Sequence, residues 1–501
     1  MYTSRQRFGL FLGPVLFLLI LMLPLPAGLK PEGLKVAAVT ILMATWWITE
    51  AIPIPATALL PIGLFPALNV MKSGAATAPY ANHLIFLFLG GFFIAIAMEK
   101  WKLHRRIALH TIRLVGTSSS RIILGFMIAT AFLSMWISNT ATTMMMMPIG
   151  LSVINKTVEH IKKHNVKGID TTPTQFRFGS ALMLGIAYAA SIGGVATIIG
   201  TPPNTILVGF IEKLYHQQVS FSLWMAFGVP LAVIMLAISW FYLVRFALPP
   251  ELKTLPGGKE HILQELKELG SITKAERRVL IVFVLVAMAW IIRGFIKLEN
   301  LMIHDATIAM LGASLLFVIP ADFKKGRFLL DWKSAVRAPW DVIILFGGGL
   351  SLANAFSVTG LADWIGGRLH ILQGMPLIII IFVVIIVAML LTEVTSNTAT
   401  TAMLIPVMAG IAVGMAVHPF GLMIAAAVAS SYAFMLPVAT PPNAIVFGSK
   451  QITIPQMMRV GIVLDIIGSV LITFFLMYVI PLLWGINMHS MPQWLSMLLH
   501  P

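Results

Sequence analysis

The sequence predicts an all-α polytopic membrane protein with about eleven transmembrane helices, two re-entrant helical hairpins and an inverted-topology repeat. Three observations lead to this prediction. Of the 501 residues, 58% are hydrophobic and 11% are charged, whereas soluble domains average about 25% charged residues. Apolar segments of membrane-spanning length recur along the chain. The hexapeptide SNTATT occurs twice, at 138–143 and at 396–401, each time within a strongly apolar stretch.

Eleven apolar segments are long enough to cross the bilayer as helices. The first follows Arg5 and Arg7 and resembles a signal peptide, but it is longer than a typical apolar region of that kind and leads directly into more membrane. We therefore predict that it is the first span. In chain order the segments are 8–29, 36–52, 53–70, 84–98, 179–210, 222–248, 279–296, 301–320, 342–358, 421–448 and 459–485.

Two further apolar segments, 121–154 and 377–410, are interrupted in the middle by SNTATT. Each arm of about 16 residues reaches roughly 24 Å, which passes the bilayer midplane but falls short of the ~30 Å hydrocarbon core. Two short apolar arms joined by a polar tip predict a re-entrant helical hairpin. Because non-helical backbone at that depth must have polar partners, each tip is expected to be buried in protein or to face water.

The positive charges predict the orientation of these segments. With a cytoplasmic amino terminus, 27 of the 34 Lys and Arg residues fall in cytoplasmic segments, in agreement with the positive-inside rule. The two hairpins then enter from opposite sides. We expect a multi-pass protein of the inner (plasma) membrane with a periplasmic or extracellular carboxyl terminus. The net charge of +15 therefore indicates no nucleic-acid partner, and the absence of cysteine excludes thiolate metal sites.

The two hexapeptides belong to a longer repeat. Their offset of 258 residues also aligns Phe88, Gly90, Gly91 and Pro148 with Phe346, Gly348, Gly349 and Pro406. A Thr-Pro-Pro-Asn tetrapeptide follows each hairpin, at 201–204 and 440–443, with an offset of 239. Inverted repeats of this kind are typical of secondary transporters, whose binding site lies where interrupted helices meet near mid-membrane.

The repeat divides the chain into five parts. Two of them carry the repeated motifs, each with a hairpin and a broken helix, and the others are expected to hold scaffold helices. The predicted division is scaffold helices at 1–83, a first repeat core at 84–210, scaffold helices with a cytoplasmic loop (251–278) at 211–341, a second repeat core at 342–448, and the last span with the carboxyl terminus at 449–501.

The hairpin tips have the chemistry of an anion site. Ser, Asn and Thr are favoured helix N-cap residues. The returning arm begins at the tip, so its free N–H groups and the positive end of its dipole point there. The hydroxyl and amide groups at 138–140 and 396–398 can donate to carboxylate or sulfate oxygens. Two such tips that meet from opposite sides could hold a dianion.

The same segments offer oxygens to a hard cation such as Na⁺. The prolines of each Thr-Pro-Pro-Asn break the helix, which leaves nearby carbonyl groups without helical partners. These carbonyls, an SNTATT asparagine and the hydroxyl of Ser134 or Thr392 could surround an ion. Ser134 and Ser138 are four residues apart, as are Thr392 and Ser396, so each pair shares a helix face if the arm stays helical.

Other interpretations stay open. Runs of Ser, Thr and Gly often serve close helix packing in membranes, although packing alone does not account for two SNT copies in one register. Glu393 either tunes a cation or proton site or hydrogen-bonds a helix end, and we favour the structural role. Glu50 is expected near the inner interface, and Asp465 has no partner that the sequence identifies.

These residues resemble the divalent anion/sodium symporter (DASS) family, the INDY-like dicarboxylate carriers. The resemblance covers about residues 35–485 and rests on the paired SNT motifs and the Thr-Pro-Pro breaks, with support from LFLGGFFIAIAMEKWKLHRRIA and WWITEAIPIPATALLP. It implies eleven transmembrane helices, two re-entrant hairpins, a homodimer, and elevator-like movement of a transport domain against a fixed scaffold.

The resemblance also implies the binding residues. The family's substrate contacts correspond to Ser138, Asn139, Thr140, Ser396, Asn397 and Thr398, with Thr201, Pro202, Thr440 and Pro441 flanking the same pocket. Its first sodium site corresponds to Ser134, Ser138, Asn139 and Gly200. Its second sodium site corresponds to Thr392, Ser396, Asn397 and Ala439.

The function that the resemblance implies is sodium-coupled symport of a divalent anion, and we expect a C4-dicarboxylate such as succinate, fumarate or malate. The alternatives are a dicarboxylate exchanger and a sodium/citrate or sodium/sulfate symporter. The motifs contain no Lys, Arg or His to replace sodium, which favours symport. We expect no cofactor besides Na⁺ at two or more sites, and no partner besides the anion, the lipid bilayer and a second copy of the chain. An enzyme with Ser138 as nucleophile is not expected, because no histidine lies beside either motif.

Overall fold

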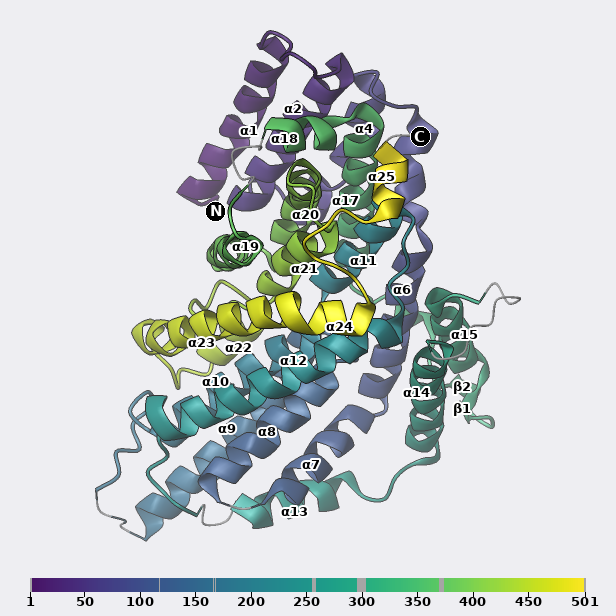
Figure 1. The fold of residues 1–501 in the computed structure, drawn as a ribbon. Coiled ribbons are helices and arrows are strands. Elements are labelled where there is room, and N and C mark those ends of the chain that lie inside the picture. The colour runs from purple at the N-terminus through teal and green to yellow at the C-terminus, as the bar shows by residue number, and fades with distance from the viewer. Residues whose placement is uncertain are drawn as a thin grey trace.

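The computed structural model describes residues 2–116, 118–164, 166, 168–254, 258–294, 303–368 and 374–499. This part of the chain is almost entirely helical (Figure 1), with one small antiparallel ladder of β1 Pro320–Asp322 and β2 Arg327–Phe328. Seven of its helical segments are long and apolar enough to cross a membrane, and five shorter apolar helices accompany them. The predicted all-α polytopic membrane fold is confirmed.

The first two helices, α1 Ser4–Met22 and α2 Pro31–Thr49, pack along each other, and the Trp46 indole donates to the Gly9 carbonyl at 3.1 Å. The predicted uninterrupted span at 53–70 is wrong. Four prolines lie in that range, and because proline has no N–H and disrupts the helix interior, the chain forms short pieces instead. They are α3 Ile54–Thr57, α4 Leu60–Ala67, α5 Ser73–Thr77 and η1 Ala78–Ala81.

The first repeat runs from the Gly-rich helix to the end of a long helix with a π-helical last turn. Its second helix, α7, was not predicted; it is amphipathic and buries Leu103, Leu109 and Ile112. The elements are α6 His83–Lys100, α7 Leu103–Val115, α8 Ser119–Ser134, α9 Asn139–Lys163, α10 Arg177–Val195, α11 Pro202–Tyr215, α12 Phe221–Tyr242 and the π-helical turn η2 Leu243–Ala247.

The segment 251–278, which the sequence predicts as a cytoplasmic loop, is partly helical. It contains α13 Gly258–Leu269 and the first turn of α14 Lys274–Arg293. Ile262 and Leu266 lie four residues apart and pack into the core, which gives α13 an apolar face to bury. α15 Asp305–Val318 and α16 Trp332–Ala335 follow. The predicted span ends at 295–296 and 301–302 lie outside the described residues.

The second repeat restates the order of the first. Each begins with a Gly-rich helix and ends with a long helix that passes into a π-helical turn. The elements are α17 Trp340–Thr359, α18 Leu361–Arg368, α19 Leu377–Thr392, α20 Asn397–Gly414, α21 Pro419–Ala429, α22 Pro441–Phe447, α23 Ile454–Phe474, the π-helical turn η4 Phe475–Val479 and α24 Ile480–Trp484. A short helix, α25 Gln493–Leu499, follows.

The two repeats pack into one body. α10, α12 and α23 lie side by side (Figure 1), and α10 of the first repeat contacts α22 of the second. The Tyr188 hydroxyl on α10 donates to the Phe434 carbonyl, 3.1 Å away. The predicted close-packing role of the Gly-rich helix is also visible, because a Cβ at Gly348 would lie 2.3 Å from the Ala58 carbonyl oxygen.

Candidate functional site

Both SNT motifs lie where a helical hairpin turns back. α8 ends at Ser134 and α9 begins after its N-cap residue Ser138; likewise α19 ends at Thr392 and α20 begins after Ser396. The free N–H groups of both returning arms therefore point at the tips. The helix face expected to carry Ser134 and Ser138 together does not form, because four non-helical residues follow the end of α8.

Behind the first tip, three oxygen atoms form what we call the first oxygen cluster. The Ser134 hydroxyl lies 2.6 Å from the Asn139 amide oxygen and 2.7 Å from the Ala190 carbonyl oxygen. A hydroxyl carries a single proton, so it cannot donate to both acceptors at once. Ser134 is fully buried, so three oxygen atoms are gathered around one hydroxyl proton in a buried place.

The second oxygen cluster has the same construction. The Thr392 hydroxyl lies 2.6 Å from the Asn397 amide oxygen and 2.9 Å from the Ser430 carbonyl oxygen. Thr392 is also fully buried. A small hard cation prefers oxygen ligands and can contact several of them together. The same gathering of three oxygen atoms at two repeat-related places suits cation binding.

Glycine shapes the first cluster on the side of the broken helix. A Cβ at Gly194 would lie 2.5 Å from the Asn139 amide oxygen, and one at Gly200 would lie 2.4 Å from the Gly194 carbonyl oxygen. Gly200 thus packs against Gly194, which in turn packs against the Asn139 amide. In the second repeat the corresponding positions are Ala433 and Ala439, so the second cluster does not require the same close approach.

The predicted site residues differ in burial between the tips and the residues that end the first arm of each hairpin. The side chains of the two SNT motifs are half-buried, whereas the hydroxyls of Ser134 and Thr392 behind them are fully buried. This layering would hold a cation deeper than an anion at the tips. The six half-buried residues are Ser138, Asn139, Thr140, Ser396, Asn397 and Thr398.

The two Thr-Pro-Pro-Asn tetrapeptides start the second half of each broken helix. Thr201 and Thr440 are the N-cap residues of α11 and α22, with nearly identical backbone angles (φ −141° and −139°). Both threonines are buried, Pro202 is half-buried and Pro441 is exposed. The asparagines that close the tetrapeptides, Asn204 and Asn443, are fully buried and were not among the predicted site residues, although their repetition was visible in the sequence.

Comparison with known proteins identifies the family. Residues 5–486 match the model of the sodium:sulfate symporter transmembrane region family. The chain belongs to this family. It is 48% identical to the sodium-dependent dicarboxylate transporter SdcS of Staphylococcus aureus, over 98% of this chain and 94% of SdcS. It is 46% identical to SdcS of Staphylococcus saprophyticus, over 97% of this chain and 93% of that one.

Solved structures resemble the chain in fold alone. MtrF of Neisseria gonorrhoeae, from a class of antimetabolite efflux pumps, superimposes with a TM-score of 0.55 at 11% identity, over 93% of this chain and 94% of MtrF. The YdaH transporter of Alcanivorax borkumensis gives 0.54 at 11% identity, over 87% of this chain and 98% of YdaH. The predicted family is confirmed, and because it is a family of membrane transporters, the enzyme alternative is excluded.

In this member of the symporter family an acidic pair holds the second broken helix. The Glu393 carboxylate accepts the N–H groups of Met435 and Leu436, each at 2.9 Å, and Asp465 accepts the N–H of Phe434 at 3.2 Å. The two carboxyl groups lie within reach of each other. Three consecutive N–H groups are thus bound by two acids, which gives Glu393 the helix-break contact that we favoured and gives Asp465 a partner.

A positively charged side chain, Arg5, reaches the second hairpin, and the sequence did not suggest this contact. Arg5 on α1 donates to the Val394 carbonyl at 3.1 Å and forms an ion pair with Glu50 at 3.4 Å. Glu50 adopts a left-handed conformation (φ 52°) where α2 ends. No sequence signal links residues 5 and 394, because only the fold brings them together. The carbonyls of Ala190 and Ser430 were missed for a similar reason: a main-chain ligand leaves no mark in the sequence.

Proposed function

We propose that this chain is a sodium-coupled symporter of a C4-dicarboxylate: succinate, fumarate or malate. The two oxygen clusters carry the proposal, because each gathers three oxygen atoms around one buried hydroxyl beside the N–H groups of an SNT tip. The names of its relatives support both the cation and the anion, since SdcS is called a sodium-dependent dicarboxylate transporter. The family model is named for sulfate, which makes sulfate the competing anion.

The first Na⁺ is assigned to the oxygens of Ser134 and Asn139, with Ser138 and Gly200 beside them. The second Na⁺ is assigned to Thr392 and Asn397, with Ser396 and Ala439. The short oxygen–oxygen distances in each cluster support these assignments, and the carbonyls of Ala190 and Ser430 extend them. The dianion is assigned to the hydroxyl, amide and N–H donors of both SNT tips, flanked by Thr201, Pro202, Thr440 and Pro441.

Two sodium ions also meet the electrostatic need. Moving a dianion inward against 100 mV, inside negative, costs about 4.6 kcal/mol. Two Na⁺ cancel that charge, and a third would make uptake electrogenic. We expect Na⁺ to bind before the dianion, because positive charge in the oxygen clusters makes the tips better anion sites.

An elevator-type movement is proposed for the two repeat cores, 84–210 and 342–448, against the remaining helices in a homodimer. Contacts among the hairpins and broken helices support a common moving body: α8 packs on α10, α10 on α22, and α20 on both α11 and α21. We place the protein in the inner (plasma) membrane with its amino terminus in the cytoplasm and its carboxyl terminus outside, on the strength of the charge distribution.

The test is uptake of labelled succinate into proteoliposomes that contain the purified protein. With an inward Na⁺ gradient, we expect saturable accumulation that disappears when K⁺ replaces Na⁺. Counterflow of succinate in preloaded vesicles without Na⁺ would instead identify an exchanger. Competition by unlabelled fumarate, malate, citrate, tartrate and sulfate then ranks the anions, and stronger competition by sulfate or citrate than by malate would overturn the C4-dicarboxylate assignment.

A further inference from the structure

The two helix breaks share a shortage of hydrogen-bond donors. α10 ends at Val195, and its last carbonyl groups have no partner within the helix. In many helices the following backbone N–H groups turn back to such carbonyls. Here Ala196 turns back to the Gly193 carbonyl, but the carbonyls of Gly194 and Val195 accept from side chains. The second break, before Pro441 and Pro442, also has carbonyls that accept from a side chain.

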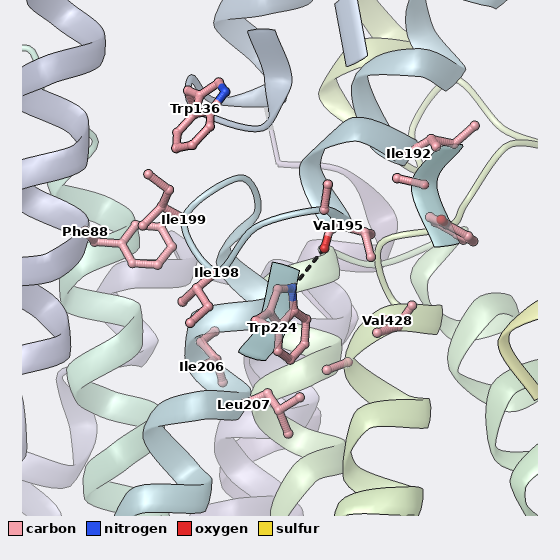
Figure 2. Packing of buried hydrophobic residues seen from close by; sticks show 14 of the residues in the cluster. Phe88, Trp136, Ile192, Val195, Ile198, Ile199, Ile206, Leu207, Trp224 and Val428 are labelled. Carbon is pink, nitrogen blue, oxygen red and sulfur yellow. Dashed lines mark hydrogen bonds between the residues drawn. The ribbon is translucent and has the colours of Figure 1, made fainter. Parts of the chain in front are cut away.

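Asn204 supplies the missing donors in the first repeat. Its side chain is fully buried. Its amide nitrogen lies 3.3, 3.2 and 2.7 Å from the carbonyl oxygens of Gly194, Val195 and Thr197. The Val195 carbonyl also accepts from the Trp224 indole at 3.0 Å, as Figure 2 shows beside the break. An amide nitrogen carries two N–H groups, so Asn204 donates to two of these three carbonyls at a time.

Asn443 does the same in the second repeat. It is fully buried, and its amide nitrogen lies 3.2 Å from the Ala433 carbonyl oxygen and 3.0 Å from that of Leu436. The offset of 239 residues maps Gly194 on Ala433 and Thr197 on Leu436. The same carbonyls are therefore bound in both repeats, although the residues that carry them differ. Generic packing does not account for this agreement.

The amide oxygens of Asn204 and Asn443 also indicate that these side chains serve as hydrogen-bond donors. Among the described residues, neither the Asn204 nor the Asn443 amide oxygen has a hydrogen-bond partner, and both atoms are buried. An unsatisfied buried acceptor is unfavourable. Its recurrence at two repeat-related positions indicates that the site uses these amides for their donors, and an ionised aspartate of the same shape has none to offer.

The bound carbonyls lead directly to the first oxygen cluster. Asn204 holds the peptide of Gly194, whose Cα faces the Asn139 amide so closely that a Cβ would clash with it. In the second repeat, Asn443 holds the Ala433 peptide, three residues after Ser430, whose carbonyl belongs to the second cluster. The amide donors therefore fix where each break meets its cluster.

We propose that Asn204 and Asn443 are positioning residues for the two cation sites: their amide donors hold the broken helix ends in the shape that presents oxygen ligands to Na⁺. This inference rests on the proposed sodium-coupled function. It assigns a role to the fourth residue of each Thr-Pro-Pro-Asn tetrapeptide, and it separates that role from direct contact with ion or anion.

The test compares Asn204→Asp, Asn204→Ser and Asn443→Asp with wild type. Asn354→Asp is the matched control, because Asn354 is a half-buried amide on α17 whose nitrogen contacts a weak acceptor, the Met71 sulfur, at 3.9 Å. Two quantities are measured: the Na⁺ concentration that half-saturates succinate uptake in proteoliposomes, and the Na⁺ concentration that half-maximally raises the thermal unfolding midpoint in detergent.

We expect both Na⁺ concentrations to rise at least tenfold in the two aspartate variants and less in Asn204→Ser, which keeps one donor. The control should match wild type. Wild-type Na⁺ dependence in folded variants, with only the maximal rate reduced, would overturn the inference, as would a failure of all three variants to fold. If wild type itself shows no response to Na⁺ in either measurement, the proposed function fails rather than this inference.

Discussion

Each oxygen cluster depends on one hydroxyl, Ser134 in the first and Thr392 in the second, which differ by a methyl group. Both hydroxyls are fully buried and both lie 2.6 Å from an asparagine amide oxygen. The amide has two ends: its oxygen belongs to the cluster, and its nitrogen remains a donor. Asn139 and Asn397 can therefore serve cation and anion together, which makes them the most sensitive residues of the site.

Replacing either asparagine should abolish transport. Asn139→Ala and Asn397→Ala each remove an oxygen ligand and an anion donor at once, so we expect sodium-driven succinate uptake at the background of empty liposomes. Asn354→Ala, outside both tips, serves as the control for expression and folding. Uptake near the wild-type rate in either tip variant would disprove the site assignment.

A methyl group at Gly194 should disable the first cluster. The new Cβ would lie 2.5 Å from the Asn139 amide oxygen, which cannot retreat without leaving Ser134. We expect at least a tenfold loss of uptake and destabilisation of about 1–3 kcal/mol, as in other overpacked cores. Gly63→Ala on α4, where a Cβ meets nothing within 4 Å, should leave uptake and the unfolding midpoint unchanged, and equal behaviour of the two variants would contradict the prediction.

At the scale of elements, the two repeats share one arrangement, but different hydrogen bonds join the helix break to the hairpin in each. In the first repeat, the Thr197 hydroxyl on the break donates to the Met135 carbonyl of the hairpin at 2.5 Å. In the second repeat, the Glu393 carboxylate accepts two N–H groups from the break. Met135 and Glu393 occupy the same place in the 258-residue offset. An acid therefore stands beside the second cluster where the first has an apolar side chain.

Glu393→Gln tests the hydrogen bonds that join Glu393 to the second helix break. The amide keeps the size of the side chain but loses the charge and one acceptor, so the bonds to Met435 and Leu436 weaken. Hydrogen bonds to charged groups contribute about 1.5–3 kcal/mol, and we expect a destabilisation of that order, measured as a lower unfolding midpoint. The matched control is Met135→Leu in the first repeat, which should change the unfolding midpoint little. If Glu393→Gln lowers the midpoint no more than Met135→Leu does, the hydrogen bonds of Glu393 do not hold the break in place.

The inverted hairpins can be tested with single cysteines, because the chain contains none. Lys163→Cys, at the end of the first hairpin, should react with a membrane-impermeant maleimide only in inside-out vesicles. Met375→Cys, beside the start of the second hairpin and 45% exposed, should react only in right-side-out vesicles. Labelling of both from the same side would show that the hairpins are not inverted.

At the scale of the whole molecule, the clusters and tips act in sequence. Cations bind in the buried clusters before the anion binds at the half-buried tips, because positive charge behind the tips raises the affinity of the tip donors for an anion. The fold supports this order, because the hairpins and the broken helices of both repeats pack into one body. A change at either cluster is then felt at the shared anion site.

Thermal unfolding in detergent measures this order. Na⁺ alone should raise the unfolding midpoint, and succinate should raise it further only when Na⁺ is present. A ligand at a hundred times its dissociation constant stabilises by about 2.7 kcal/mol, which is enough to shift the midpoint by a few degrees. Li⁺ and K⁺ at equal ionic strength are the controls. Stabilisation by succinate without any Na⁺ would contradict ordered binding.

Several features could be read from the residues because they repeat. The SNTATT copies placed both hairpin tips correctly, since polar N-cap residues inside an apolar segment have few other uses. Features without such a signal were missed. The amphipathic helices α7 and α13 were not predicted, because they lie in segments rich in polar and charged residues. The prolines of 53–70 divide a segment that composition alone predicted as one continuous span.

The sequence by itself determined the membrane fold, the family, and the pairing of Ser134 with Asn139 and of Thr392 with Asn397. The length of the apolar segments, the distribution of Lys and Arg, and the register of the repeat are all visible in the sequence alone. Only the tertiary structure decided which carbonyls complete each cluster, which donors Asn204 and Asn443 provide, and how Asp465 meets Glu393. Main-chain oxygens are the same at every residue, so only folding selects the ones that face a buried site.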